Sequence, residues 1–177
     1  LNPGDSIIIT TPFRVKIPSG KFSRLGHIGQ SYQITQWFAK PAVFDKNGWH
    51  PMSYLDQGEF FSEFGNYDVS ITVPKNYLLM ATGDLQNEQE LEFLNEKAEL
   101  TAQLMEENKL PVRDSFGKKD MSFPKSSLEK KTLRFVQKNV HDFAWFTDKR
   151  YHILKGEVDI NNRKITSWAL FTNNEAK

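Results

Sequence analysis

The sequence has no cysteine among its 177 residues, which excludes a disulfide framework and any metal site built from thiolates. It also has no apolar run of about 18 residues, the length that a transmembrane helix requires. The formal net charge is only +1, so the chain lacks the basic surplus that is typical of nucleic-acid-binding proteins. Neither a membrane span nor a nucleic-acid partner is therefore expected.

Signatures of catalysis are absent as well. The sequence contains no H-E-x-x-H, G-x-S-x-G, P-loop or G-x-G-x-x-G motif. His27, His50 and His152 stand alone, and His141 adjoins Asp142, but neighbours along a strand point to opposite faces. Because a reaction needs an assembled nucleophile, base or metal, we expect no catalytic or metal-ligating residues in this chain.

What the sequence does contain is a series of β-strand patterns. Tyr67, Val69, Ile71 and Val73 alternate strictly with other residues, which indicates a half-buried strand ended by Pro74. Weaker patterns of the same kind predict further strands at 6–11, 13–17, 32–38, 77–82, 132–137, 151–160 and 163–171. The chain is therefore predicted to be a single all-β domain over residues 1–177, with antiparallel or mixed sheets.

Turn signals separate several of these strands. Asn161-Asn162 is a good two-residue hairpin turn, and Asp45-Lys46-Asn47-Gly48 predicts a tight turn. The latter lacks the full ligand pattern of a calcium loop, so the turn is preferred. Residues 22–29 are interpreted as a loop, and 49–64 as a long aromatic loop whose rings pack onto the sheet or, alternatively, form a functional surface.

One segment has helical rather than β character. Strong helix formers fill residues 87–110, with Leu91, Leu94 and Ala98 on one side at helical spacing and Pro111 beyond the end. We interpret residues 84–130 as a helical insertion in a loop. Residues 84–108 hold eight acids and one base, whereas residues 109–138 hold nine bases and three acids. These blocks are either two solvated faces that attract each other or a docking surface for a partner.

The alternation over 32–38 places Gln36 on the same strand face as Tyr32, Ile34 and Phe38. A buried amide without a hydrogen bond costs about 1–3 kcal/mol. Gln36 is therefore either satisfied by nearby backbone or held at a pocket wall to meet a ligand.

A run of segments resembles the N-terminal domain of the zinc aminopeptidase family that includes aminopeptidase N, in the branch common in Bacteroidetes-type bacteria. The resemblance covers roughly residues 5–83 and 131–172. The matching segments are Ser31–Trp37, Lys40–Asp45, Gly48–His50, Tyr54–Phe60, Glu63–Gly83 and Val140–Phe146.

The resemblance implies a saddle-like or sandwich β domain that precedes a thermolysin-like catalytic domain. In the family, that second domain carries the zinc ligands and the G-x-M-E-N motif, and this chain contains neither. The resemblance also implies that Gln36, with Trp37 and Phe38 beside it, reaches the N-terminus of a peptide substrate. Phe38 stands where the family often has a second polar residue. The start at Leu1 looks like a cut inside a longer protein, and the bacterial branch implies an extracytoplasmic location.

Three functions follow as hypotheses. The first is a non-catalytic β domain that caps the cleft of a zinc aminopeptidase-like metallopeptidase, with its own catalytic domain and a peptide substrate as partners and zinc only in that catalytic domain. The second is a free-standing module that binds a glycan or peptide through Trp37, Trp49 and the aromatic loop. The third is a scaffold on which the acidic helix docks another protein.

Overall fold

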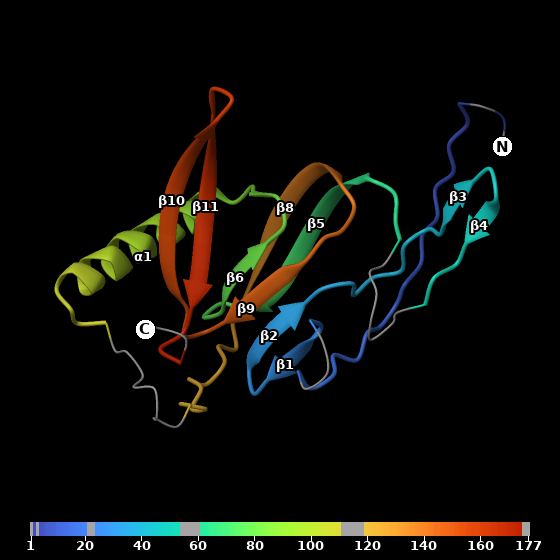
Figure 1. Ribbon diagram of the computed structural model, residues 1–177. Coiled ribbons are helices and arrows are strands. Elements are labelled where there is room, and N and C mark those ends of the chain that lie inside the picture. Colours follow the sequence, from blue (N-terminus) through green and yellow to red (C-terminus); the bar gives the residue numbers. More distant parts are fainter. Residues whose placement is uncertain (1, 3, 21–23, 54–60, 111–118, 175–177) are drawn as a thin grey trace.

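The computed structural model describes residues 2, 4–20, 24–53, 61–110 and 119–174. In these ranges the chain folds into short antiparallel sheets and one α-helix, which confirms an all-β fold with a helical insertion. Figure 1 shows the helix and a long hairpin at one end, two sheets in the middle, and a small hairpin with the N-terminus at the opposite end.

The first central sheet has four antiparallel strands in the order β1-β2-β9-β6. The strands are β1 (Gly26–Ile28), β2 (Ser31–Ile34), β9 (Trp145–Asp148) and β6 (Leu78–Ala81). The interpretation of residues 22–29 as a loop is thus wrong at β1, which pairs with β2 around a turn at Gly29-Gln30. A three-residue strand is too short to show an alternating pattern.

The second central sheet has three strands in the order β5-β8-β7. The strands are β5 (Gly65–Pro74), β8 (Lys130–Val140) and β7 (Asp84–Leu85). The predicted alternation in β5 is confirmed, because Ile71 and Val73 are buried while their neighbours Ser70 and Thr72 are exposed. β6, although it follows β5 in sequence, pairs with β9 in the other sheet.

Gly83 makes the change from one sheet to the other possible. It lies between β6 and β7 with φ of 95°, and a Cβ atom placed there would lie 2.6 Å from the carbonyl oxygen of Val136. Only glycine adopts this backbone conformation readily and leaves room for so close an approach. The bend carries the chain from the β6–β9 pair to the β7–β8 pair.

The main core lies between these two sheets. Its buried residues come from β5, β6, β8 and the segments that flank them, and Trp37, Phe38 and Trp145 pack around its margin. The buried members are Ile71, Val73, Tyr77, Leu79, Leu133, Phe135 and Phe143. Phe143 lies in the break between β8 and β9, so the apolar stretch 140–146 supplies a core side chain in addition to the end of one strand and the start of the next.

The helix α1 (Glu88–Glu106) lies within the predicted range and packs against the hairpin formed by β10 (His152–Ile160) and β11 (Arg163–Phe171). Its buried face is Leu94, Ala98 and Thr101, while Leu91 is 38% exposed, so the apolar side is narrower than predicted. The Asn161-Asn162 turn is confirmed, with φ of 51° and 61°. In the part of the chain that the structure describes, no helix is both long and apolar enough for a membrane crossing.

The N-terminal segment departs from the prediction. Residues 6–17 form no strand, and Ile8 is 91% exposed. Apolar alternation was present there, but no described strand lies alongside to complete a ladder. The small hairpin of β3 (Val43–Asp45) and β4 (Gly48–His50) does contain the predicted tight turn, with Gly48 at φ of 101°.

Candidate functional site

Gln36 does not lie on a strand, so the prediction of a strand over 32–38 is wrong beyond Ile34. β2 ends at Ile34, and Gln36 adopts the left-handed backbone region with φ of 51°. This conformation is uncommon for residues other than glycine, and its presence at a particular side chain justifies asking what that side chain does. Because the chain turns at Gln36, the Gln36 side chain does not follow the strand alternation that would place it beside Tyr32 and Ile34.

Trp37 holds the turned segment against the main core. Its indole nitrogen donates a hydrogen bond of 3.0 Å to the carbonyl oxygen of Phe143. Its ring packs edge-on against Phe38 and Trp145, with centroid distances of 5.3 and 6.5 Å. Trp37 is thus a packing residue that fixes the positions of its neighbours, Gln36 and Phe38.

Gln36 and Phe38 line a cavity of about 430 Å³, and Trp37 does not. The other walls come from the segment after Phe38, from the end of β4 with the residues that follow it, and from Phe61. These are Ala39, Lys40, Pro41, Ala42, His50, Pro51, Met52, Ser53 and Phe61. We call this space the Gln36 cavity. Of the three predicted site residues, the structure therefore brings two together at one surface.

Lys40 is fixed at one side of the Gln36 cavity by several groups. Its ammonium nitrogen lies 2.7 Å from a carboxylate oxygen of Asp142 and donates to the carbonyl oxygen of His141 at 3.2 Å. It also lies 5.4 Å from the centre of the Phe38 ring. Both charged side chains are mostly buried, so solvent screens their attraction less than it would screen that of an exposed pair. Asp142 thus pairs with Lys40 and forms no catalytic dyad with His141.

His50 closes another side of the cavity. Its Nε2 lies 2.8 Å from the Asp45 carboxylate, and its ring packs edge-on against Phe61. The His50 hydrogen bond, together with the backbone N–H of Asn47, holds the pKa of Asp45 below its ordinary value of 3.8. The Asp45 carboxylate is therefore used within the hairpin, in agreement with a turn rather than a calcium loop.

The cavity places polar, charged and aromatic side chains side by side. Among the described residues, none hydrogen-bonds the Gln36 amide, which can both donate and accept. Within the same ranges, no group of three or more His, Asp or Glu side chains comes together. The Gln36 amide and the Lys40 ammonium group suit a polar peptide backbone, and the Phe38 ring suits an apolar side chain.

The expectation that the rings of the aromatic loop pack onto the sheet is wrong for the described ones. Trp49 is 68% exposed, and among the described rings it packs against Phe44, tilted by 55° at a centroid distance of 4.9 Å. Phe61 and Phe64 are also exposed. Residues 54–60, with Tyr54 and Phe60, lie outside the described residues. Phe44 and Trp49, which are register partners on the β3–β4 hairpin, are called the aromatic surface.

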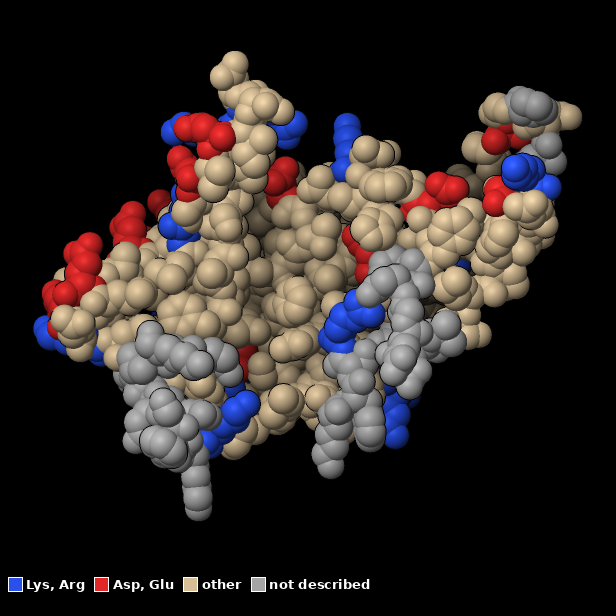
Figure 2. All heavy atoms as spheres, in the orientation of Figure 1, with Lys and Arg blue, Asp and Glu red and all other residues tan. Residues whose placement is uncertain are grey.

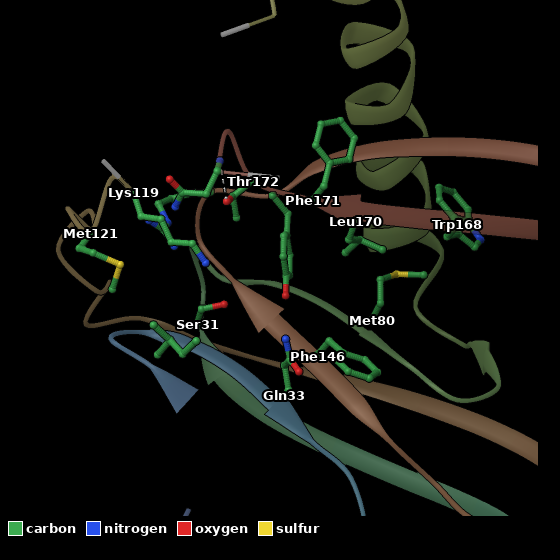
Figure 3. Close-up of a pocket in the computed structure, with 14 residues that line it drawn as sticks. Ser31, Gln33, Met80, Lys119, Met121, Phe146, Trp168, Leu170, Phe171 and Thr172 are labelled. Carbon is green, nitrogen blue, oxygen red and sulfur yellow. Dashed lines mark hydrogen bonds between the residues drawn. The ribbon is translucent and has the colours of Figure 1, made fainter. Parts of the chain in front are cut away.

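A second cavity of about 430 Å³ lies between the four-stranded sheet and the C-terminal end of β11 (Figure 3). Gln33 and Phe146, which are register partners on β2 and β9, form one side of it. Leu170 and Phe171 of β11 form the other side. Its described lining residues are mixed in character and include no acid–base pair, and none of them lines the Gln36 cavity.

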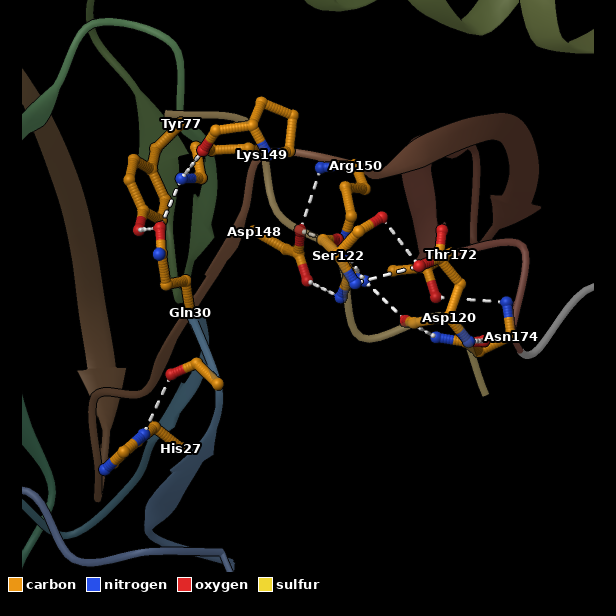
Figure 4. A network of polar contacts seen from close by, with 12 residues as sticks. His27, Gln30, Tyr77, Asp120, Ser122, Asp148, Lys149, Arg150, Thr172 and Asn174 are labelled. Carbon is orange, nitrogen blue, oxygen red and sulfur yellow. Dashed lines mark hydrogen bonds and ion pairs between the residues drawn. The ribbon is translucent and has the colours of Figure 1, made fainter. Parts of the chain in front are cut away.

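Beside the second cavity, a polar network ties the chain's later segments together (Figure 4). Arg150 donates from Nε and Nη2 to the fully buried Asp148 carboxylate, at 3.0 and 2.8 Å. Arg150 Nη1 and Asn174 Nδ2 both donate to the carbonyl oxygen of Asp120, each at 2.9 Å. These hydrogen bonds hold the segments around Asp120, Asp148 and Asn174 together, so the network has a structural role.

Lys149 belongs to the same network. It donates to the Gln30 side chain and to the carbonyl oxygen of Pro124, and it lies 5.1 Å from the centre of the Tyr77 ring. Burial lowers the pKa of Lys149, and the negative charge of Asp148 offsets part of that change. Sequence reasoning missed Lys40, Asp142 and Lys149, because each meets its partners only through the tertiary fold.

Comparisons of the chain with protein families, curated proteins and solved structures found no match. Its function is therefore inferred from its residues and their arrangement.

Proposed function

We propose that this chain is a non-catalytic β domain of a zinc aminopeptidase-like metallopeptidase and presents Gln36 to the N-terminal residues of a peptide substrate. The first support is the series of segments that resemble such domains and follow in the same order along the chain, from Ser31–Trp37 to Val140–Phe146. The observation that carries the proposal is the Gln36 amide, which has no partner among the described residues and is held at φ of 51° on the wall of a cavity.

In this proposal the domain caps the catalytic cleft, and its partners are its own catalytic domain and the substrate. Gln36 donates to and accepts from the peptide backbone or the terminal amine, while Phe38 contacts an apolar side chain. Zinc belongs to the catalytic domain, where it polarises the scissile carbonyl and activates water. An extracytoplasmic location in a bacterium is part of the proposal.

The test is Gln36→Ala in the complete peptidase. We expect a raised KM or a lowered kcat/KM for peptide substrates, with circular dichroism unchanged, because the amide contacts substrate and not the fold. Gln33→Ala on the adjacent strand is the matched control and should leave both constants unaltered, since Gln33 lies outside the Gln36 cavity. Identical kinetics for Gln36→Ala and the parent protein would remove Gln36 from the site.

The aromatic surface favours a second candidate, a free-standing module that binds a glycan or peptide. Exposed aromatic faces suit both ligands, and Trp49 is 68% exposed beside Phe44. Titration of the isolated chain with oligosaccharides and peptides, monitored by tryptophan fluorescence, tests it. A Kd below about 1 mM, or roughly −4 kcal/mol, that is lost in Trp49→Ala would favour this candidate.

The third hypothesis, a scaffold that docks a partner on the acidic helix, also stays a proposal. Figure 2 shows acidic side chains over the end of the molecule that holds α1. Glu88, Glu92, Glu96 and Glu99 belong to this helix. A pull-down that loses its partner when residues 87–110 are deleted would favour the scaffold.

A further inference from the structure

A groove of about 790 Å³ lies on the side of the β10–β11 hairpin that faces the two central sheets. One wall is formed by residues 80–85 of β6 and β7, and the other by residues 163–170 of β11, with Leu91 and Leu94 of α1 also in the lining. Figure 1 shows β11 as the hairpin strand nearer to β6, and Figure 2 shows the surface hollowed beside the hairpin. We call it the hairpin groove. It shares no residue with the Gln36 cavity.

Both walls are edges of sheets. Among the described strands, β6 pairs only with β9, β7 only with β8, and β11 only with β10. An edge strand presents a row of unpaired N–H and C=O groups, which is a template for another extended chain. Two such edges facing one groove therefore specify an occupant with its own regular backbone hydrogen-bonding groups, which is an extended peptide.

The side chains of the groove specify the residues of that peptide. Met80, Leu85, Trp168 and Leu170 supply an apolar surface that also borders the smaller core cluster under α1. Because side chains of an added strand point alternately to opposite faces, every second residue of the peptide would meet this surface. These positions require apolar side chains.

The charges along the groove favour acidic residues at the remaining positions. Of the described residues, Lys155, Arg163 and Lys164 line it, and Asp84 is the one acidic side chain among them. Lys164 lies 3.3 Å from Glu157, but both side chains are largely exposed, so that pair is weak and its lysine can turn to a ligand. Lys155 donates to the uncharged side chain of Asn95 at 3.0 Å.

We propose that the hairpin groove binds an extended peptide segment of a partner protein as an added β-strand, with apolar side chains at alternate positions and acidic side chains between them. This site lies apart from Gln36 and does not depend on the proposed peptidase role. The added strand joins the hairpin to the central sheets, and it covers edges that are otherwise open.

The probe is a fluorescein-labelled peptide of about eight residues that alternates Val and Glu, a normal strand length, titrated into the 177-residue chain. We expect saturable anisotropy. The double variant Arg163→Glu, Lys164→Glu should raise Kd about tenfold, or roughly 1.4 kcal/mol. The control Arg14→Glu, Lys16→Glu makes the same charge change on the N-terminal segment, outside the groove, and should leave Kd unchanged.

A second peptide tests strand addition itself. N-methylation of alternate peptide nitrogens removes backbone donors and keeps the side chains, and we expect it to weaken binding about tenfold or more. Hydrogen exchange should show new protection in 78–85 or 163–170 when the unmodified peptide binds. The proposal is overturned by no saturable binding, by equal binding of the N-methylated peptide, or by equal effects of the two charge variants.

Self-association is the remaining outcome. The segment 6–11 of a second copy is apolar, exposed and unpaired with any described strand, so it too is an extended chain. Sedimentation that shows dimers which disappear on deletion of residues 1–12, with peptide binding gained by the same deletion, would assign the groove to a second copy and overturn the partner assignment.

Discussion

At the scale of single residues, Gln36 combines a strained backbone with a side-chain amide that no described residue hydrogen-bonds. A residue other than glycine in this region costs about 1–3 kcal/mol, and such strain persists where the surrounding structure enforces it. Here Trp37 holds the strained conformation of Gln36 in place. Its hydrogen bond to Phe143 and its ring contact with Trp145 fix the residue that directly follows Gln36. Substitutions at Gln36 can therefore remove the side-chain amide and either keep or relieve the backbone strain.

Gln36→Gly should raise the free energy of unfolding by up to about 1 kcal/mol relative to Gln36→Ala, because glycine adopts φ of 51° without steric cost and alanine does not. Urea unfolding of the two variants measures the difference, and both lack the amide. A glycine variant that is less stable than the alanine variant would show that the left-handed conformation at residue 36 is wrong.

Asp45 gives a pH-dependent prediction. Its pKa is lower in the folded chain than the ordinary value of 3.8, so it binds a proton less readily when folded. The carboxylate therefore stabilises the β3–β4 hairpin above the ordinary value, and this contribution is lost as the pH falls through the lowered pKa.

NMR titration of the Asp45 carboxyl should thus give a midpoint below 3.8, and Asp45→Asn should remove the acid-induced change in hairpin signals. His50→Gln should bring the midpoint upward, because the His50 hydrogen bond is the largest cause of the lowering. A midpoint at or above the ordinary value in the unmutated chain would contradict the contact between Asp45 and His50.

At the scale of elements, α1 is held by a narrow stripe rather than a broad apolar face. Leu94 is fully buried and Leu100 is 49% exposed, although both are leucines in the same helix. Leu94→Ala should cost about 2–5 kcal/mol through lost burial and a cavity, whereas Leu100→Ala should cost less than about 0.5 kcal/mol. Thermal unfolding of the two variants tests this order. Equal losses would mean that α1 packs on a different face.

The β10–β11 turn offers the reverse test, an increase in stability. Asn161 and Asn162 both have positive φ, the geometry that a two-residue hairpin turn of the favoured kind requires. Asn162→Gly should raise the free energy of unfolding by a few tenths to about 1 kcal/mol, and Asn162→Val should lower it, since a β-branched side chain resists positive φ. Urea midpoints of the two variants provide the measurement, and the opposite order would exclude this turn type.

Much of the fold could be predicted where local pattern and tertiary packing agree. The alternation of β5, the Asn161-Asn162 turn and the helix over Glu88–Glu106 depend on neighbours in sequence, and all three are present. The pairing of β6 with β9 could not be predicted, because it depends on partners far apart in the chain. The left-handed turn at Gln36 does not alter the hydrophobic alternation of the sequence. The predicted strand over 32–38 therefore continues beyond Ile34, where β2 ends.

The candidate site was only partly predictable for the same reason. Gln36 and Phe38 do share one cavity, but Trp37 turns to the core. Lys40, which lies on the cavity wall, gains its fixed position from Asp142, about a hundred residues later in the chain. No sequence pattern connects those two residues.

At the scale of the whole molecule, the Gln36 cavity and the hairpin groove occupy separate regions of the surface. The Gln36 cavity and the aromatic surface belong to the β3–β4 end, while the hairpin groove lies beside β10–β11 (Figure 1). The described residues supply amides, rings and charges suited to recognition at both places.

The most direct test of the proposed function is the coding sequence read onward from Lys177. If this chain is the β domain of a zinc peptidase, an H-E-x-x-H motif and a later glutamate ligand should follow within a few hundred residues. A reading frame that ends soon after Lys177, or one that continues without these zinc ligands, would contradict the peptidase assignment and favour a binding module.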